Sequence, residues 1–590
     1  MLLKKLSLPI IATALSAQAF AYDFSSYTEH YQTSDYREAL NMGLKFFGGQ
    51  RCGNSNNWML VNNPELTKKY CHTQDGKGSV NGGGNGSYDL SGGWHDCGDH
   101  IKVAVTMGSS AAFLAMTYDI WPEAFQDNYD GAYGAKNGIP DVLDELKYAT
   151  DYFMKSFIDD NTFVYYVGSP GDHNLWMTSS KQSEQTVENG GDPRPVWTST
   201  TLGGPQAANY ASALALMAIH YPDPTYQAKC KNYALKAYNY AVKNKSNHAP
   251  IEQFYPSPNT EWTDELALAA VLIYKMTNES KYLNEAIAYL QGKWESNSPI
   301  AWDTMSDFTY YYIVKAKSDA NNGQGGTFAS FLEKNVFNLH LKKGESDTNG
   351  FPYYTNTWGT NKLACGGAVA CALFYKLVKD NVVTTSYDID KAKNFNRRIV
   401  DYVLGYNEFN HTFLHGFKGD MTYRLHHRNA MGRNDNPVTS VKNSCDYMFA
   451  SGGMLGGPSS TGVFSNIVEG GPSYTETEGG CDYNAAFVAA IANIVADKDP
   501  YNDVELTLSD RSFAVYPTIF DDYIIVDMIE RAYTDEATAT LYSVDGQMVK
   551  NIDLTNNISS VINTDNLSGG FYILKISNGR ETASYKLIKK

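Results

Sequence analysis

The stretch TDELALAAVLIYKMTNESKYLNEAIAYLQ, residues 263–291, decides the fold class. Apolar residues recur at helical spacing over 262–276 and again over 279–292, as in two helices that each bury one face. Thr263, Asp264 and Glu265 open the first helix, where acidic side chains complement the helix dipole. Because so few residues separate the two helices, the segment predicts a helical hairpin.

The same spacing recurs between residues 35 and 497. Further helices are expected at 36–48, 101–120, 140–157, 206–221, 226–243, 303–318, 327–336, 359–379, 389–404 and 483–496. With the first pair they form six hairpins, which can close into a double ring of six outer and six inner helices. The long connections at 158–205 and 405–482 would then surround one open end, and connections of this length are usually functional.

The first residues predict export. Two lysines precede an apolar run at residues 6–15, and Ala19 and Ala21 stand two apart, so residues 1–21 have the layout of a cleaved signal peptide. Residues 22–34 form a lead-in to the first helix. No later stretch reaches about 18 uninterrupted apolar residues, so no membrane span is expected. The net charge of −16 disfavours nucleic acid and suits a neutral substrate.

The pattern changes after a linker at residues 498–503. Residues 504–590 show short alternating runs such as SFAVYP, YIIVDMI and GFYILKIS, with turn residues between them. This period-two pattern predicts a small β-sandwich. The segment contains no histidine, no cysteine and no readable catalytic motif, so chemistry is expected only in residues 35–497.

Two segments place carboxylates ahead of apolar helices. GGWHDCGDHIK, residues 92–102, has Asp96 and Asp99 three apart at a loop-to-helix junction, so both can point at one water molecule. SYTETEGGCDYNAAF, residues 473–487, carries Glu478, and a buried glutamate there would have the raised pKa that an acid catalyst needs. For both segments the alternative is a helix start, where acidic residues act as caps.

A third segment, TYRLHHRNAMGR at residues 422–433, supplies His426, His427 and Arg428. Adjacent histidines can hold a metal, but no HExxH motif or acidic companion follows at ligand spacing. Hydrogen bonds to a substrate or to a carboxylate fit the pattern better. The eight cysteines show no zinc-ligand spacing either, and Cys52 with Cys71 is the nearest pair for a disulfide.

Taken in order, these motifs resemble glycoside hydrolase family 9. The resemblance rests on YREALNMGLKFFGGQRCG, DLSGGWHDCGDHIK, NGIPDVLDELKYATDYFMK, TDELALAAVLIYKMTNESKYL, YVLGYN, HHR and EGGCDYNAAF, and covers residues 35–497. It implies an all-α (α/α)6 barrel and a secreted enzyme that cuts β-1,4-glucan, such as cellulose, with inversion. In that reaction one carboxylate activates water and one carboxylic acid protonates the leaving oxygen.

The resemblance assigns roles to individual residues. The family's D-A-G-D motif falls on residues 96–99, which implies Asp99 as the base and Asp96 as its partner, with Cys97 in place of alanine. The family's acid falls on Glu478, and the first histidine of HHR falls on His426. The substrate is expected to contact Arg428, His427, Tyr483, Trp358 and Trp94.

The loop before the acid departs from the family's pattern, which is Y-x-D-x-R-x-D-Y-x-x-N-E. Here Glu469 stands at the first Asp, Gly471 replaces Arg, Ser473 replaces the second Asp and Thr477 replaces Asn. The hydrogen bonds that support the acid must therefore differ, and Glu469 is the one candidate support.

Catalysis by inversion needs no metal or other cofactor, but the family often holds structural Ca²⁺. Oxygen-rich stretches at 127–130 and 257–264 offer ligands, with solvated surface as the alternative. The tail, in VYPTIFDDYIIVD, ATLYSVDGQMV, INTDNLSGGFYILKIS and YKLIKK, resembles the C-terminal sorting domain of the type IX secretion system. It implies export across an outer membrane and a partner in the secretion machinery.

The leading hypothesis is a monomeric endo-β-1,4-glucanase. An exo-acting cellobiohydrolase, a cellodextrinase or a mixed-linkage glucanase would use the same fold. A non-catalytic glycan-binding protein is the alternative of another class, against which the joint presence of Asp96, Asp99 and Glu478 argues.

Overall fold

The computed structural model divides into two compact units, residues 1–500 and 501–590. The structure describes residues 22–53, 71–81, 84–127, 137–251, 255, 262–291, 298–317, 323–355, 358–431, 452–464, 474–498, 513–516, 519–520, 522–528, 537–555, 559–577 and 582–589. The predicted signal peptide at 1–21 lies outside these residues.

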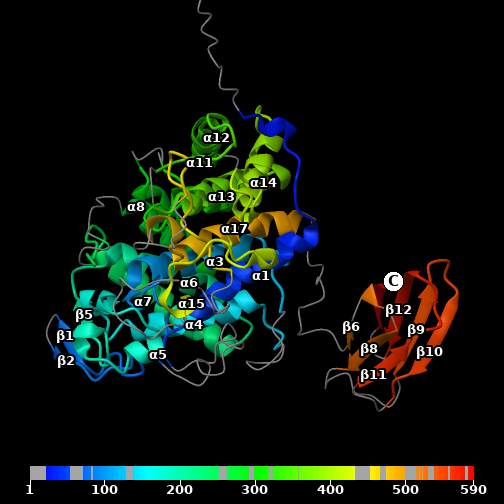
Figure 1. The fold of residues 1–590 in the computed structure, drawn as a ribbon, viewed down its shortest axis with the longest axis horizontal. Coiled ribbons are helices and arrows are strands. Elements are labelled where there is room, and N and C mark those ends of the chain that lie inside the picture. Colours follow the sequence, from blue (N-terminus) through cyan, green and yellow to red (C-terminus); the bar gives the residue numbers. More distant parts are fainter. Residues whose placement is uncertain are drawn as a thin grey trace, which may run out of the picture. The chain divides into compact units, whose positions relative to one another are not determined.

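The described part of the first unit is mainly helical (Figure 1). The contacts between its helices place twelve of them alternately in an inner and an outer position. The inner helices are α3 (Ala104–Ile120), α6 (Gly204–His220), α8 (Thr263–Thr277), α10 (Ser306–Lys317), α13 (Thr360–Lys379) and α17 (Cys481–Lys498). Each packs against the next, and α17 packs against α3, which closes the ring. The outer helices are α1 (Thr33–Gln50), α4 (Asp141–Lys155), α7 (Pro224–Lys243), α9 (Ser280–Tyr289), α11 (Gly323–Lys334) and α14 (Ile389–Leu404). The predicted (α/α)6 barrel is confirmed.

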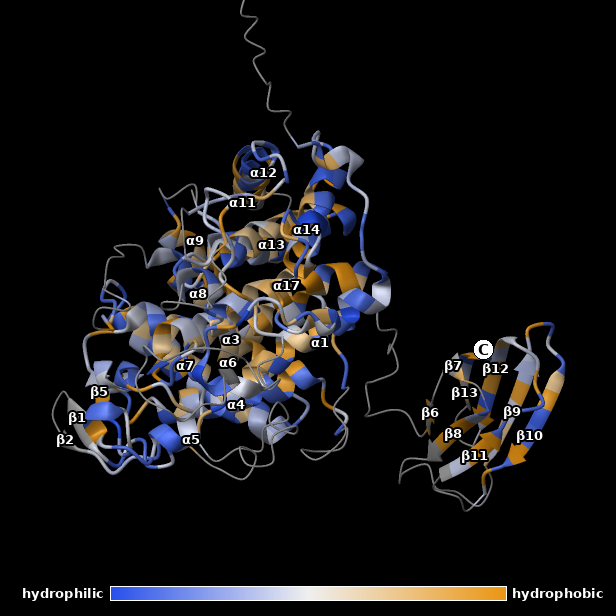
Figure 2. Cartoon of the chain, in the orientation of Figure 1, coloured by the Kyte–Doolittle hydropathy of each residue, from blue (hydrophilic) through white to orange (hydrophobic). Residues whose placement is uncertain are grey.

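Burial explains which helices are inner. Every residue from Thr263 to Ile273 of α8 is buried, because other helices surround it. In its partner α9, only Tyr282, Leu283, Ala286 and Ile287 are buried, on one face. The inner helix α17 is likewise drawn largely in the hydrophobic colour in Figure 2.

Short elements fill the connections. The α-helices are α5 (Ser179–Gln182), α12 (Leu341–Glu345), α15 (Arg428–Met431) and α16 (Tyr474–Thr477); the 3-10 turns are η1 (Phe24–Ser26), η3 (Pro122–Ala124), η4 (Pro170–Asn174), η5 (Val187–Asn189) and η8 (Phe417–Gly419); η7 (Asn335–His340) is a π-helical turn.

The connection at 158–205, expected only as a long loop, contains part of a five-stranded sheet in the order β2-β1-β5-β4-β3. Its strands are β1 (Ser79–Asn81), β2 (Gly84–Asn85), β3 (Lys102–Val103), β4 (Phe163–Val167) and β5 (Val196–Ser199). Lys102 pairs with Val167. This pairing joins the connection to the segment that carries Asp99. Because residues 102–103 form a strand, α3 begins at residue 104, three residues later than the predicted start at 101.

The second unit is a β-sandwich, which confirms the predicted small all-β domain. One sheet has the order β10-β9-β12-β13-β7 and the other β11-β8-β6. The strands are β6 (Phe513–Tyr516), β7 (Ile519–Phe520), β8 (Tyr523–Met528), β9 (Thr538–Ser543), β10 (Met548–Asp553), β11 (Ser559–Asn563), β12 (Gly570–Ser577) and β13 (Thr582–Lys589). Leu541, Leu574 and Leu587 of one sheet and Ile524 and Val526 of the other form its core.

Among the described residues of both units, no helix combines the length and the apolar character that a membrane span requires.

Candidate active site

Backbone hydrogen bonds join three of the predicted segments at the amino-terminal ends of inner helices. The Arg428 amide donates to the Gly98 carbonyl at 2.9 Å, and the His426 amide donates to the Thr477 carbonyl at 2.9 Å. A Cβ atom on Gly98 would lie 2.2 Å from the His426 oxygen, so this close approach requires glycine. The segments that carry Asp99, His426 and Glu478 are thus brought together.

The two aspartates of the first segment have different surroundings. Both oxygens of Asp96 accept hydrogen bonds, one from the Thr106 hydroxyl and one from the Tyr255 hydroxyl at 2.6 Å. Burial and the charge of Asp99 raise the pKa of Asp96 to about 7. Asp99 has one oxygen 3.2 Å from Nε2 of His173, while its Oδ1 is buried without a hydrogen-bond partner among the described residues.

A fourth segment, Pro170–Asn174 and the residues after it, supports the first and third. Asp172 is buried, accepts from the His100 amide at 3.1 Å and pairs with Arg428 at 2.7 Å. Burial opposes the charge of Asp172, but Arg428 outweighs it and lowers the pKa of the carboxyl. The Trp176 ring lies 4.7 Å from the His426 ring. This segment therefore holds the imidazole and the guanidinium of HHR in place.

The Glu478 carboxyl lies among other carboxyls. Burial raises its pKa well above the ordinary value, and the charges of Asp99, Asp96 and Asp482 raise it further. Asp482, four residues later, pairs with Lys362 of α13 at 2.6 Å. A carboxyl in these surroundings keeps its proton to a higher pH than a solvated glutamate does, as a proton donor requires.

Aromatic rings lie beside these groups. Trp358 is 52% exposed, and its ring centroid lies 5.5 Å from that of Tyr474, which is 47% exposed. Tyr474 in turn lies 6.0 Å from His426. Trp358 has a φ of 58°, a backbone conformation that costs energy for a residue with a side chain, so its exposed position is maintained against strain. An exposed ring pair of this kind can hold a sugar.

Two of the expected substrate contacts are wrong. Trp94 is fully buried and packs against Phe47 at 4.9 Å, and His427 is 1% exposed and hydrogen-bonds to Gln50 at 2.8 Å. Both lie in polar motifs, but packing of the barrel takes their rings out of reach of a ligand.

The other expected contacts are placed as follows. Arg428 is 4% exposed and is paired with Asp172. Tyr483 is 3% exposed, and the centroid of its ring lies 4.8 Å from Lys362 Nζ. Trp358 is open to solvent. Glu469 lies outside the described residues, so its predicted role as a support stays a prediction.

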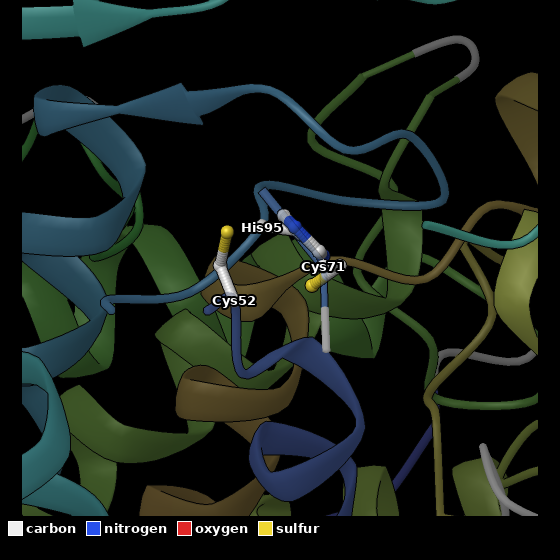
Figure 3. Close-up of side chains that lie close together, drawn as sticks. All are labelled: Cys52, Cys71 and His95. Carbon is white, nitrogen blue, oxygen red and sulfur yellow. The ribbon is translucent and has the colours of Figure 1, made fainter. Parts of the chain in front are cut away.

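Beside this site lies a buried group of sulfur and nitrogen atoms. Cys52, Cys71 and His95 each offer one atom, and these atoms lie within 4.8 Å of one another (Figure 3). Cys52 and Cys71, the nearest pair that the sequence offers for a disulfide, are free thiols in the structure. A hydrogen bond from Cys52 lowers the pKa of Cys71 to about 6, and both ring nitrogens of His95 are buried without partners among the described residues. Thiolate and neutral imidazole are the ligands that Zn²⁺ prefers, so this donor set fits such an ion.

The neighbouring group of His72, Asp75 and Asp192 fits a cation less well. Asp75 already pairs with Arg194 at 2.7 Å and with Lys102 at 2.8 Å. His72 Nε2, however, is buried without a partner among the described residues, and its ring lies 5.8 Å from that of His95. It is therefore available to the sulfur-containing group.

The expected calcium stretches show backbone partners where they are described. Asp127 accepts from the Gly138 amide at 2.7 Å, and Asp264 accepts from the Met305 amide at 2.6 Å. The rest of 127–130 and most of 257–264 lie outside the described residues, so the calcium expectation stays a prediction.

Sequence reasoning missed the supporting residues. His173 and Asp172 lie in GDHNLW, whose acid, imidazole and indole within six residues could have marked the 158–205 connection. Tyr255 reaches Asp96 from an irregular segment and has no sequence signal. The adjacent Cys71 and His72 were the available signal for a metal site.

A closed double ring of helices with paired carboxyls, an imidazole and exposed indole at one end has the architecture of a six-hairpin glycosidase. The model of glycosyl hydrolase family 9 matches residues 36–491, and the chain belongs to this family. The model of a secretion system C-terminal sorting domain matches residues 514–590, which confirms the predicted export of the chain.

Relatives and solved structures agree with this assignment. Endoglucanase A of Bacillus pumilus is 26% identical over 78% of this chain and 66% of its own length, and endoglucanase A of Fibrobacter succinogenes is 34% identical over 43% and 57%. The cellulase Cel9M of C. cellulolyticum, solved with cellobiose, superimposes with a TM-score of 0.63 at 26% identity, over 78% of this chain and 98% of Cel9M. The chain spans about two thirds or less of the length of several curated relatives it matches.

Proposed function

We propose that the protein is a secreted endo-β-1,4-glucanase that hydrolyses cellulose and related glucans with inversion. Asp99 is the base that activates water, and Glu478 is the acid that protonates the leaving oxygen. Asp96 and His173 position Asp99, and His426 contacts the sugar next to the cleaved bond. The relatives' names, endoglucanase, and the cellobiose in the Cel9M complex support this substrate class.

One observation carries the assignment of the base: of the two neighbouring aspartates, Asp99 has the unoccupied oxygen. Asp96 has both oxygens engaged by hydroxyl donors and a pKa near 7. Asp99 receives His173 on one oxygen, which leaves Oδ1 for a water proton. Since a general base must hydrogen-bond to the proton it removes, Asp99 fits that role and Asp96 fits a supporting one.

The surroundings of Glu478 likewise support its assignment as the acid. A proton donor must be protonated when the substrate binds, and the pKa of the half-buried Glu478 is raised by desolvation and by the charges of three other carboxyls. Its backbone is fixed to His426 by a parallel bridge, so the acid and the imidazole keep a constant relation.

Viscosity and reducing-sugar release from carboxymethylcellulose test this proposal. An endoglucanase thins the solution before much sugar is released, whereas an exo-acting cellobiohydrolase releases sugar with little thinning. A glycan-binding protein binds the polymer and gives no product, which would refute the proposal.

We propose further that Cys52, Cys71 and His95, with His72, hold a structural Zn²⁺. The unpartnered nitrogens and the depressed pKa of Cys71 support this. A bound zinc ion would fix the 50–53, 71–72 and 95 segments to one another next to Asp96. It takes no part in the reaction, which the carboxyls perform.

A further inference from the structure

The outward face of the five-stranded sheet in the C-terminal unit carries an apolar strip, here called the outer strip. Phe571 and Ile573 of β12 are 64% and 43% exposed, Ile588 of β13 is 37% exposed and Met548 of β10 is 63% exposed. The strand register makes them neighbours, because Phe571 pairs with Ile588 and Tyr542 of β9 pairs with both Met548 and Ile573. Cross-strand partners on one face touch, so these five side chains form one continuous surface.

The sandwich does not need these side chains for its core. The alternate residues of β12, which are Tyr572, Leu574 and Ile576, are buried between the two sheets. A solvated face of an antiparallel sheet normally carries polar residues. A contiguous exposed apolar surface on a small domain therefore marks an interaction site.

The charges around the outer strip define its partner. Lys586 pairs with Ile573 across the strands, and Lys575 lies two residues further along β12. The other described outward positions of the three central strands carry Thr538, Thr540, Ser577 and Ser584, none of them acidic. Asp553 of β10 pairs with Thr538 on this face, but at the end of the sheet away from Phe571. A surface that complements this face is apolar at its centre and bordered by carboxylates.

We propose that the outer strip is the surface through which this unit binds a protein receptor of the secretion apparatus, one that presents an apolar patch bordered by carboxylates. The match of residues 514–590 to a secretion sorting domain favours this occupant, because a sorting domain acts by being bound. Phe571 would be the main anchor, since large aromatic side chains dominate interface energetics. The inference rests on the sorting role of the unit and is independent of the catalytic proposal.

The test uses the full chain in a bacterium that has this type of secretion system. Phe571→Ser with Ile573→Ser changes the outer strip. The matched control is Val561→Ser with Tyr523→Ser, because these side chains are 66% and 51% exposed on the other sheet. Immunoblots of medium, outer membrane and periplasm measure export.

We expect the outer-strip variant to leave the cell about tenfold less than wild type, or worse, and to accumulate in the periplasm, while the control is exported normally. Protease resistance of the tail checks folding. If the tail of this variant is unfolded, Lys575→Glu with Lys586→Glu tests the proposal instead. Exposed lysines add little to the core, so this variant should fold, and reversing the charge beside the outer strip should also impair export.

Normal export of both outer-strip variants would overturn the proposal, as would equal loss in the control. If export is normal but a dimer of the protein is lost, the outer strip binds a second copy of the chain. If export is normal but the barrel becomes less stable, the outer strip binds the chain's own catalytic unit. Deletion of 504–590 provides the reference, because normal export of that truncated chain would refute the sorting role itself.

Discussion

The segment with Asp96 and Asp99 and the segment with Glu478 are held in different ways. Side-chain donors from Thr106, Tyr255 and His173 engage the aspartates of the first segment. The second is fixed through its backbone, and burial and nearby charge set its carboxyl pKa. Burial and neighbouring carboxylates raise a carboxyl pKa in both segments, that of Asp96 and that of Glu478. The difference teaches that donors on three of the four aspartate oxygens leave one oxygen of Asp99 open to a water molecule, whereas the raised pKa suits Glu478 to donate a proton.

The largest effect is expected from the acid. Glu478→Gln should reduce hydrolysis of cellulose about 1,000-fold or more, because an amide cannot protonate the leaving oxygen. Activity on aryl cellobiosides with very good leaving groups should fall much less, since these need no proton. Steady-state rates on both substrates measure the contrast, and equal losses would remove Glu478 from the acid role.

The base segment should show a graded response. Asp99→Asn should lower kcat by about 100-fold or more, because water activation is lost. Asp96→Asn should cost less, since Asp96 only positions. Azide should restore turnover of Asp99→Asn on an activated substrate and give a product of inverted configuration. A larger loss in Asp96→Asn, with azide rescue there instead, would exchange the two roles.

A smaller effect is expected on the pH dependence. In the proposed mechanism Glu478 acts in its protonated form, so activity should be lost as pH rises through its pKa. Asp482 raises that pKa, and Asp482→Asn should therefore move the alkaline limb of kcat/KM to lower pH by about half a unit to one unit. The charged groups with the largest effects on the pKa of Glu478 are Asp99, Asp96, Asp482 and Arg428, of which Arg428 alone lowers it.

The partner of Asp482 provides the matched variant. Lys362→Met leaves Asp482 without its cation and should move the same limb to higher pH. If the alkaline limb of kcat/KM is unchanged in both variants, or shifts in the same direction in both, neighbouring charges do not set the pKa of a catalytic acid at Glu478.

The smallest effect on catalysis is expected from the sulfur-containing group. Removal of metal by a chelator should lower the Tm of the catalytic unit while changing activity at 25 °C little, because the proposed zinc ion has a structural role only. Without any chelator, Cys71→Ala should have the lowered Tm that wild type shows after metal removal, and chelator should not lower it further. Zinc analysis should find no bound ion in this variant. Cys365→Ala, a buried free thiol elsewhere, should keep the response. A wild-type protein that is free of zinc and insensitive to chelator would refute the site.

The helices and the paired carboxyls could be predicted because local pattern determines them. The inner helix α8 is buried on all sides over Thr263–Ile273 and the outer helix α9 is buried on one face, and the spacing of apolar residues records this directly. Asp99 and Glu478 lie beside helix starts in motifs that the family resemblance identifies.

The rest depends on contacts between distant residues. Tyr255 lies 159 residues from Asp96, and no local pattern records that contact. Trp94 and His427 occur in polar motifs but are buried by packing against Phe47 and Gln50. Cys52 and Cys71 are near each other in the sequence, which suggested a disulfide, but only the fold brings His95 beside them.

The anomeric configuration of the first product tests the central claim most directly. Proton NMR of cellopentaose during the first minutes of hydrolysis distinguishes the two anomers before mutarotation mixes them. A base at Asp99 that activates water opposite the leaving group predicts that the new reducing ends appear first as the α-anomer. Initial release of the β-anomer would contradict the roles assigned to Asp99 and Glu478.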